Sequence, residues 1–431
     1  MNKTKALAIT SFALFSLFFG AGNLLLPPLL GYNSGDHWLW VSIGFMLTAV
    51  FVPILGIYAH SKLQGTLFDF GKKVSPSFSF LYCVIIYIIA VAIPSPRTAA
   101  ATYEIAIAPN FNVGALSTSL VYFAFVLVFV FNRSKILQLI GKYLTPVIVI
   151  ILLLVILVSL FTLDFRVASV PMEFPLLNGV FEGYQTFDAI GSVVVGAVII
   201  ILINQKFDYS FEEKKALIKK SGIISGLGLF LIYLGLIATG AFFSAEINLD
   251  DTLSNDMQRA NLLRHISNTA LGNIGGSVLS ILIGLACFTT AVGIVTGAAD
   301  HFKGLFKNSK TVYVITAILA CVFGVVVGQL NFNAIIVIAI PFLLFIYPIT
   351  IILILLNAIP ERFASVLVFR LVVLVTFLFS IPDVIGFILP SETLEGIIAY
   401  IPLAEHSFGW VLPAFITFVL VNVLSRKALS V

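Results

Sequence analysis

Two glycines and two prolines interrupt an apolar segment near the amino terminus, where they would leave backbone groups free to bind a ligand. The segment from 6 to 35 carries no charged residue and is long enough to cross a bilayer core of ~30 Å at ~1.5 Å per residue. Gly20 and Gly22 loosen a helix, and Pro27 and Pro28 lack the N–H groups that would bond carbonyls one turn earlier. Because hydrocarbon tolerates free backbone groups only where they face protein, water or a ligand, we predict a binding site here. A glycine-mediated packing kink is the alternative.

The chemistry of such an interruption would be that of two helix ends. The N–H groups of about Ala21, Gly22 and Asn23 would begin a half-helix, where the dipole and the unpaired donors favour a carboxylate. The carbonyls that end the preceding half-helix would favour a cation. The sequence therefore predicts that an anion and a cation bind next to each other in this span.

A second polar pattern lies at Thr289 and Thr290, in the middle of another apolar run. One buried threonine can bond the carbonyl four residues earlier and would mean little by itself. Two adjacent hydroxyls and a carbonyl one turn earlier form a compact set of oxygens that suits a hard cation. Ion coordination and self-satisfied hydroxyls both fit this pattern.

Charged residues that lie inside apolar runs include Arg97, Glu104 and Asp188. A charge within a membrane is costly, so Arg97 should have a carboxylate partner or water. Glu104 lies two turns further along the same helix face, and Asp188 is the other possible partner. We expect an ion pair that gates or supports the structure, with direct contact to a substrate as the alternative. Asp188 could instead bind sodium or carry a proton.

The composition identifies an all-α polytopic membrane protein. Of the 431 residues, 60% are hydrophobic and only 10% are charged, against roughly 25% charged in an ordinary soluble domain. The formal net charge of +4 is explained by basic residues that flank membrane spans, so we expect no nucleic-acid partner. The histidines lie at the ends of spans and the three cysteines lie far apart, so we expect no resident metal or other cofactor.

Charge-free runs predict twelve transmembrane helices, at about 6–31, 38–60, 77–107, 116–132, 146–163, 180–204, 221–244, 274–299, 311–328, 334–358, 365–388 and 407–424. If the amino terminus lies inside, most of the 24 Lys and Arg residues fall on the cytoplasmic side. This distribution follows the positive-inside rule and predicts that both termini are cytoplasmic.

The interruption in span one has a counterpart in span six, between Glu182 and Ser192. An odd number of spans in each unit forces two successive units to be inverted, and paired broken helices then build a site at the midplane. We predict two inverted repeats of five helices plus two accessory helices. The first repeat covers 1–163, the second covers 164–360, and the accessory helices cover 361–431.

Two segments of the second repeat would lie outside the membrane. Residues 206–220 carry both signs of charge and are expected to form a cytoplasmic linker, and 245–273 form the longest external loop. Within that loop, 255–271 has the apolar spacing of a helix. It could be an external gate, or a helix that rests on the membrane interface.

Three motifs together closely resemble the bacterial branched-chain amino acid:cation symporters, the BrnQ-type family of the LeuT-type superfamily. The motifs are the runs Phe18–Pro28, Ile93–Glu104 and Gly183–Ala189. The resemblance implies a symporter in the bacterial plasma membrane that imports leucine, isoleucine and valine with sodium. A proton-coupled amino acid transporter is the alternative. An enzyme or a channel is remote, because no nucleophile with a base and no repeated lining rings are evident.

The resemblance also implies residue roles. Residues 22–27 resemble the Gly-Asn-x-x-x-Pro of the unwound first helix in LeuT-type transporters, and 286–290 resemble their sodium-binding Ala-x-x-Thr-Ser. The implied sodium ligands are the carbonyls of Ser16, Phe19 and Ala286 and the hydroxyls of Thr289 and Thr290. The implied substrate residues are Ala21, Gly22 and Asn23 in span one and Tyr184, Gln185, Thr186 and Phe187 in span six. A second sodium at Asn23 is a weaker expectation, since span seven offers no clear polar partner.

Overall fold

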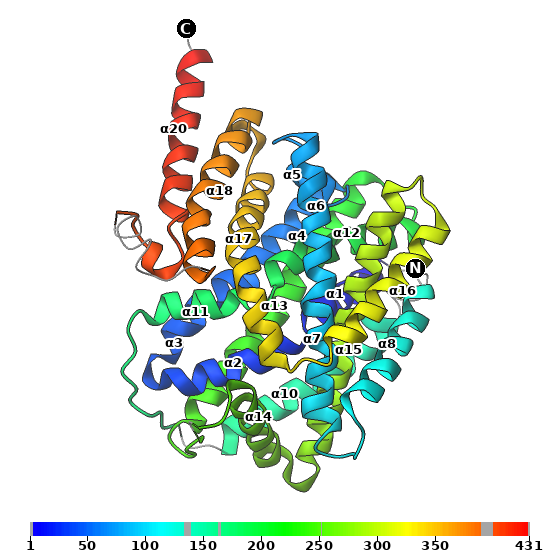
Figure 1. The fold of residues 1–431 in the computed structure, drawn as a ribbon, viewed down its shortest axis with the longest axis vertical. Coiled ribbons are helices and arrows are strands. Elements are labelled where there is room, and N and C mark those ends of the chain that lie inside the picture. The colour runs from blue at the N-terminus through cyan, green and yellow to red at the C-terminus, as the bar shows by residue number, and fades with distance from the viewer. Residues whose placement is uncertain (1–2, 133–138, 163–164, 251, 389–399, 430–431) are drawn as a thin grey trace.

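The structure is a computed structural model that describes residues 3–132, 139–162, 165–250, 252–388 and 400–429, and these are helical or connect helices (Figure 1). Nine stretches of this described chain are long and apolar enough to cross a membrane, and two shorter apolar helices accompany them at Ala115–Phe131 and Val411–Ser425. The all-helical class is therefore confirmed, while the count of twelve spans stays a prediction.

The helices follow the predicted runs closely. In chain order they are α1 (Lys3–Phe18), α2 (Ala21–Ser34), α3 (Trp38–Met46), α4 (Val52–Leu63), α5 (Phe68–Gly71), α6 (Pro76–Ala92), α7 (Pro94–Ala101), α8 (Ala115–Phe131), α10 (Thr145–Thr162), α11 (Pro175–Tyr184), α12 (Asp188–Lys206), α13 (Phe211–Phe243), α14 (Asn255–Leu271), α15 (Gly275–Leu305), α16 (Lys310–Val327), α17 (Phe332–Ala358), α18 (Val366–Ile388) and α20 (Val411–Leu429). Because α13 begins at Phe211, most of the predicted linker is helical.

Span one is broken at Phe19 and Gly20, between α1 and α2. The prediction of an interruption that extends to the prolines was too wide, because Pro27 and Pro28 lie inside α2. A proline removes one hydrogen bond but holds φ near the helical value, so a helix that has already begun can continue through it. Gly20 has an extended backbone, with φ −114° and ψ −162°, and it separates the two half-helices.

Spans three and six are broken as well. Ile93, with φ −120° and ψ −72°, separates α6 from α7, where Pro94 begins a new helix. Residues 185–187 separate α11 from α12, and Phe187 has the left-handed backbone φ of 65°. A positive φ is uncommon for a bulky residue and is maintained only where the surroundings hold it. The breaks in spans one and six lie within the two interruptions that the sequence predicts.

Close packing of backbones fixes α2 against α13. A Cβ atom on Gly31 would lie 1.9 Å from the carbonyl oxygen of Ile237, and a Cβ atom on Gly240 would lie 1.9 Å from that of Pro28. Only glycine permits such contact between helices. The second half of span one is therefore held tightly along span seven.

The predicted helix of the external loop is present as α14, near the lower edge of Figure 1. Its buried Leu262 and Ile266 pack with Leu29 of α2, Val155 of α10 and Phe243 of α13. The helix therefore lies on the protein and covers the ends of several spans. Whether it acts as a gate stays a prediction.

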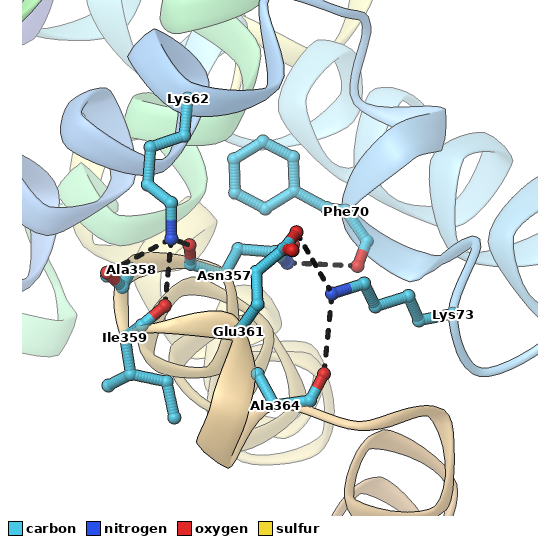
Figure 2. Close-up of polar contacts among 8 residues, drawn as sticks. All are labelled: Lys62, Phe70, Lys73, Asn357, Ala358, Ile359, Glu361 and Ala364. Carbon is cyan, nitrogen blue, oxygen red and sulfur yellow. Dashed lines mark hydrogen bonds and ion pairs between the residues drawn. The ribbon is translucent and has the colours of Figure 1, made fainter.

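At the opposite end of the molecule, one lysine joins span two to span ten. Figure 2 shows Lys62 of α4 donating hydrogen bonds to the carbonyls of Asn357 at 2.8 Å, Ala358 at 3.4 Å and Ile359 at 2.8 Å. The side chain of Asn357 donates to the Phe70 carbonyl of α5 at 3.1 Å. A lysine at this position satisfies carbonyls that the end of α17 leaves unpaired and complements the helix dipole. We call this set of contacts the Lys62 latch.

Candidate functional site

A small buried cavity lies between the breaks of spans one and six, and we call it the central cavity. Its lining includes eight of the residues singled out in the sequence, namely Ala21, Gly22, Asn23, Arg97, Thr186, Phe187, Asp188 and Thr290. Apolar side chains form the rest of the wall, among them Phe18, Ala90, Ile190, Val194 and Ile294. Its volume of about 50 Å³ is well below the ~150 Å³ of a cavity that holds benzene. The walls must therefore move apart to admit an amino acid.

Asn23 connects the break of span one to spans six and seven. Its Oδ1 accepts a hydrogen bond from the Gly20 N–H at 3.1 Å. Its Nδ2 donates to Asp188 Oδ2 at 2.6 Å and also contacts the Tyr233 hydroxyl. Tyr233 in turn donates to the same Asp188 oxygen at 3.2 Å. All three side chains are buried, and we call them the Asn23–Tyr233–Asp188 cluster.

The break of span six presents Asp188 to the cavity. The left-handed Phe187 ends the irregular segment, and Asp188 is the first residue of α12. The Thr186 hydroxyl accepts the Asp188 N–H at 3.2 Å and donates to the Gly183 carbonyl at 2.7 Å. A carboxylate at a helix amino terminus is favoured by the helix dipole. Local backbone geometry thus offsets part of the cost of burying this charge.

Arg97 enters the same cavity from α7. Its Nη1 donates to the Gln185 carbonyl at 2.7 Å, within the break of span six. Its guanidinium lies 4.3 Å from the ring centre of Phe332 and 5.9 Å from that of Phe187. It also packs against Gly22, because a Cβ atom there would lie 2.5 Å from Arg97 Nη2. Arg97 therefore contacts both broken spans.

The predicted cation ligands of spans one and eight meet at Thr289. Its hydroxyl donates to the carbonyls of Ser16 at 2.9 Å and Ala286 at 3.0 Å, and it accepts from the Ser16 hydroxyl at 2.9 Å. All three residues are fully buried. The structure thus gathers four oxygen atoms of the kind that a hard cation prefers. We call them the Ser16–Ala286–Thr289 cluster.

Two further predicted sodium ligands lie beside this cluster. Phe19 occupies the break itself and is fully buried. Thr290 packs against Gly20, where a Cβ atom would lie 2.9 Å from its Oγ1. Among the described residues, this hydroxyl is buried without a hydrogen-bond partner. An unpaired hydroxyl at this position is available to a cation, although the five-oxygen site itself stays a prediction.

Three other predicted residues lie behind the cavity wall. The Tyr184 ring packs against Tyr347 at 4.5 Å between ring centres. The Gln185 side chain donates to Glu182 Oε1 at 3.1 Å. Glu104 accepts the N–H of Phe332, at the start of α17, at 3.0 Å. Their contact with substrate, or for Glu104 a gating role, stays a prediction.

The expectation that span seven lacks a polar partner for Asn23 was wrong, because Tyr233 fills that role. The missed signal was a tyrosine inside an apolar span, which ordinarily places its hydroxyl at a partner when buried. Sequence alone could not show which partner it meets, because Tyr233 lies 210 residues from Asn23.

A second cavity of about 330 Å³ begins one helical turn from the central cavity, toward α5. The two cavities are lined by neighbouring turns of α6, α12 and α15. In its wall, the rings of Tyr87 and His301 stack at 4.4 Å between centres. Asp69 and Gly304 line it further from the central cavity. The second cavity therefore lies on the side of the central cavity that faces α5.

Solved structures with a similar fold include a symporter and a protein in complex with an amino acid. A Na⁺-coupled sialic acid symporter matches with a TM-score of 0.62 and 13% identity, covering 96% of this chain and 89% of that one. MhsT in complex with L-phenylalanine matches with a TM-score of 0.56 and 15% identity, covering 97% of this chain and 98% of that one. At such low identity, these matches establish the LeuT-type fold.

Sequence comparison is more specific. The chain is 32% identical to the branched-chain amino acid permease BraB of Bacillus subtilis, over 97% of this chain and 95% of that protein. It is 31% identical to the branched-chain amino acid transport system 2 carrier protein of Pseudomonas aeruginosa, over 96% and 95% respectively. The family model described as branched-chain amino acid transport protein matches residues 3–428. The chain therefore belongs to the branched-chain amino acid transport protein family, whose members are membrane transporters and not enzymes.

Proposed function

We propose that this protein is a sodium-coupled symporter that imports leucine, isoleucine and valine by alternating access. The observation that carries the sodium assignment is the Ser16–Ala286–Thr289 cluster, which joins the first half of span one to span eight. A sodium ion bound among these oxygens would hold the broken helix in place. The amino acid would then bridge the breaks of spans one and six, and the walls of the central cavity would open toward the cytoplasm.

The shape of the central cavity supports a branched-chain substrate. Its lining combines polar groups at the helix breaks with aliphatic and aromatic side chains. An amino acid with a branched aliphatic side chain has the same division into a charged and an apolar end. The names of the relatives, which refer to branched-chain amino acids, support the same substrate class.

We assign the protein to the bacterial plasma membrane, with both termini in the cytoplasm. The relatives are bacterial, and the basic residues concentrate on one side of the predicted spans. In this orientation the Lys62 latch and the second cavity lie on the cytoplasmic side, and α14 lies outside.

The test is isoleucine uptake into proteoliposomes under a sodium gradient, comparing the wild type with Thr289→Val. Losing one polar contact to a charged partner costs about 1.5–3 kcal/mol, so the sodium concentration for half-maximal uptake should rise about 10- to 100-fold. Thr296→Val is the matched control on the same helix. Among the described residues its hydroxyl is buried without a hydrogen-bond partner, so uptake should be unchanged. An unchanged sodium dependence in Thr289→Val would contradict the sodium assignment.

Proton coupling is the second possibility, and the buried carboxylate of Asp188 is the observation that favours it. Proton coupling predicts that a proton gradient without sodium drives isoleucine uptake as strongly as a sodium gradient does. The same proteoliposomes distinguish the two ions.

A further inference from the structure

The central cavity is lined by two side chains of opposite charge, Arg97 and Asp188, which come from different spans. Both residues are buried, with exposed fractions of 3% and 2%. Buried charges are retained in membrane proteins mainly where they pair or bind something. The two charges face the space that the proposed substrate would enter.

The position of Arg97 indicates an anion site. Its guanidinium packs against Gly22, at the amino terminus of α2. The first N–H groups of a helix and its dipole make this end positive. The Arg97 guanidinium therefore places a second positive group beside the positive end of α2. A carboxylate bound between the guanidinium and the helix end would stabilise both. Arg97 and the start of α2 therefore form two walls of one anion site.

The position of Asp188 indicates a cation site in the same cavity. Both of its side-chain hydrogen bonds, from Asn23 and Tyr233, end on Oδ2. The Thr186 hydroxyl also lies near this carboxylate, but it donates its hydrogen bond to the Gly183 carbonyl. The two donors fix the carboxylate and leave one oxygen for a positively charged group in the cavity.

We propose that Arg97 and Asp188 clamp the two charges of the substrate: the Arg97 guanidinium binds the α-carboxylate, together with the N–H groups of Ala21 and Gly22, and the Asp188 carboxylate binds the α-ammonium group. The inference rests on the proposed amino acid transport. It assigns Arg97 and Asp188 to direct ligand contact, rather than to a pair that serves only gating or support. The aliphatic wall at Val194 and Ile294 then receives the side chain.

The test uses ligands that lack one charge. Equilibrium binding of isoleucine, its α-keto acid (no ammonium group) and 2-methylbutylamine (no carboxylate) is measured on the purified full-length protein, for the wild type, Asp188→Asn and Arg97→Gln. An asparagine oxygen can still accept the bonds from Asn23 and Tyr233, so Asp188→Asn removes charge and little else. Arg370→Gln is the control, since Arg370 is an exposed arginine of α18 that donates to the Val74 carbonyl at 3.0 Å.

We expect Asp188→Asn to weaken isoleucine binding at least 10-fold and to strengthen binding of the α-keto acid at least 10-fold relative to the wild type. Arg97→Gln should weaken isoleucine similarly and strengthen the amine. Both expectations follow because a buried charge that a ligand leaves unpaired rejects that ligand strongly. Arg370→Gln should bind all three compounds as the wild type does.

Absence of any gain for the α-keto acid in Asp188→Asn, including no detectable binding, would overturn the clamp.

If Arg97→Gln does not fold, as judged by size-exclusion chromatography, Arg97→Lys tests whether Arg97 binds the carboxylate. It keeps the charge but loses the planar fork, so isoleucine and the α-keto acid should weaken together while the amine is unaffected. An equal loss for all three compounds would overturn carboxylate binding by Arg97. A wild type that takes up no branched-chain amino acid would instead refute the proposed function.

Discussion

Asn23 shows how one side chain can determine the geometry of a buried site. Its amide oxygen must face the Gly20 N–H, and its amide nitrogen must face the Asp188 carboxylate, because the reverse orientation would oppose like partners. The amide thereby fixes the backbone of the break and the position of a charge at once. Tyr233 holds the same carboxylate from span seven.

Tyr233→Phe should therefore weaken isoleucine binding. The change leaves Asn23 and Asp188 each with one partner fewer, which costs about 1–2 kcal/mol, or about 5- to 30-fold in affinity. Tyr313→Phe is a matched control, since the Tyr313 hydroxyl donates to the Val130 carbonyl at 2.9 Å. Titration of isoleucine and thermal unfolding should show that both variants lose stability and only Tyr233→Phe loses affinity. Equal affinities in the two variants would argue against the role of the cluster.

Prediction from sequence succeeded where the information was local. The breaks at Gly20 and before Asp188 follow from neighbouring residues, as does the helical spacing that defines α14. The pairing of Thr289 with Ser16 required the family resemblance as well. Tyr233 was missed because its role arises from packing between helices that are distant in sequence, and no local pattern records that packing.

At the scale of elements, the contact between α2 and α13 determines where the second half of span one can lie. The backbones meet at Gly31 and Gly240, with no side chain between them. The break at Gly20 gives α1 and α2 separate directions, and this contact fixes only α2. The first half-helix, which carries Ser16, has a close contact of its own, because a Cβ atom on Gly141 would lie 2.1 Å from the carbonyl oxygen of Ile9.

Gly31→Ala should destabilise the protein, because its Cβ atom would meet the Ile237 carbonyl oxygen at 1.9 Å. Overpacking of this kind costs about 1–3 kcal/mol. Gly284→Ala is the control in α15, where nothing lies within 4 Å of the new Cβ atom, and it should be neutral or gain up to about 1 kcal/mol in helix propensity. Thermal unfolding in detergent compares the two. Similar melting temperatures would show that the helices separate more readily than the structure indicates.

At the scale of the whole molecule, two features lie between the central cavity and the end of the bundle near α5, which we propose to be cytoplasmic. The Tyr87–His301 stack lies in the wall of the second cavity, and the Lys62 latch joins α4 to the end of α17. A lysine that bonds three carbonyls can release them together when the helices separate. The latch is therefore suited to hold the closed arrangement until the spans move.

Lys62→Met should expose the second cavity more often. Gly304→Cys provides the probe, because Gly304 lines that cavity and has open space around its Cβ position. The three native cysteines are buried, so they contribute little background. Maleimide should label this cysteine several-fold faster when Lys62→Met is present. Lys72→Met, an exposed neighbouring lysine, is the control and should leave the rate unchanged. Equal rates in the two backgrounds would rule out a closing role for Lys62.

The break at Gly20 also has a thermodynamic consequence. Ser16 and Asn23 lie on either side of this break, so the Ser16–Ala286–Thr289 cluster and the central cavity share one short piece of backbone. If sodium binds that cluster and isoleucine binds that cavity, as we propose, any ordering of this backbone by sodium is ordering that isoleucine no longer has to supply. Linkage then requires reciprocity: the factor by which sodium tightens isoleucine binding must equal the factor by which isoleucine tightens sodium binding. Under this proposal, the free energy that couples the two solutes would reside in a few residues of unwound chain.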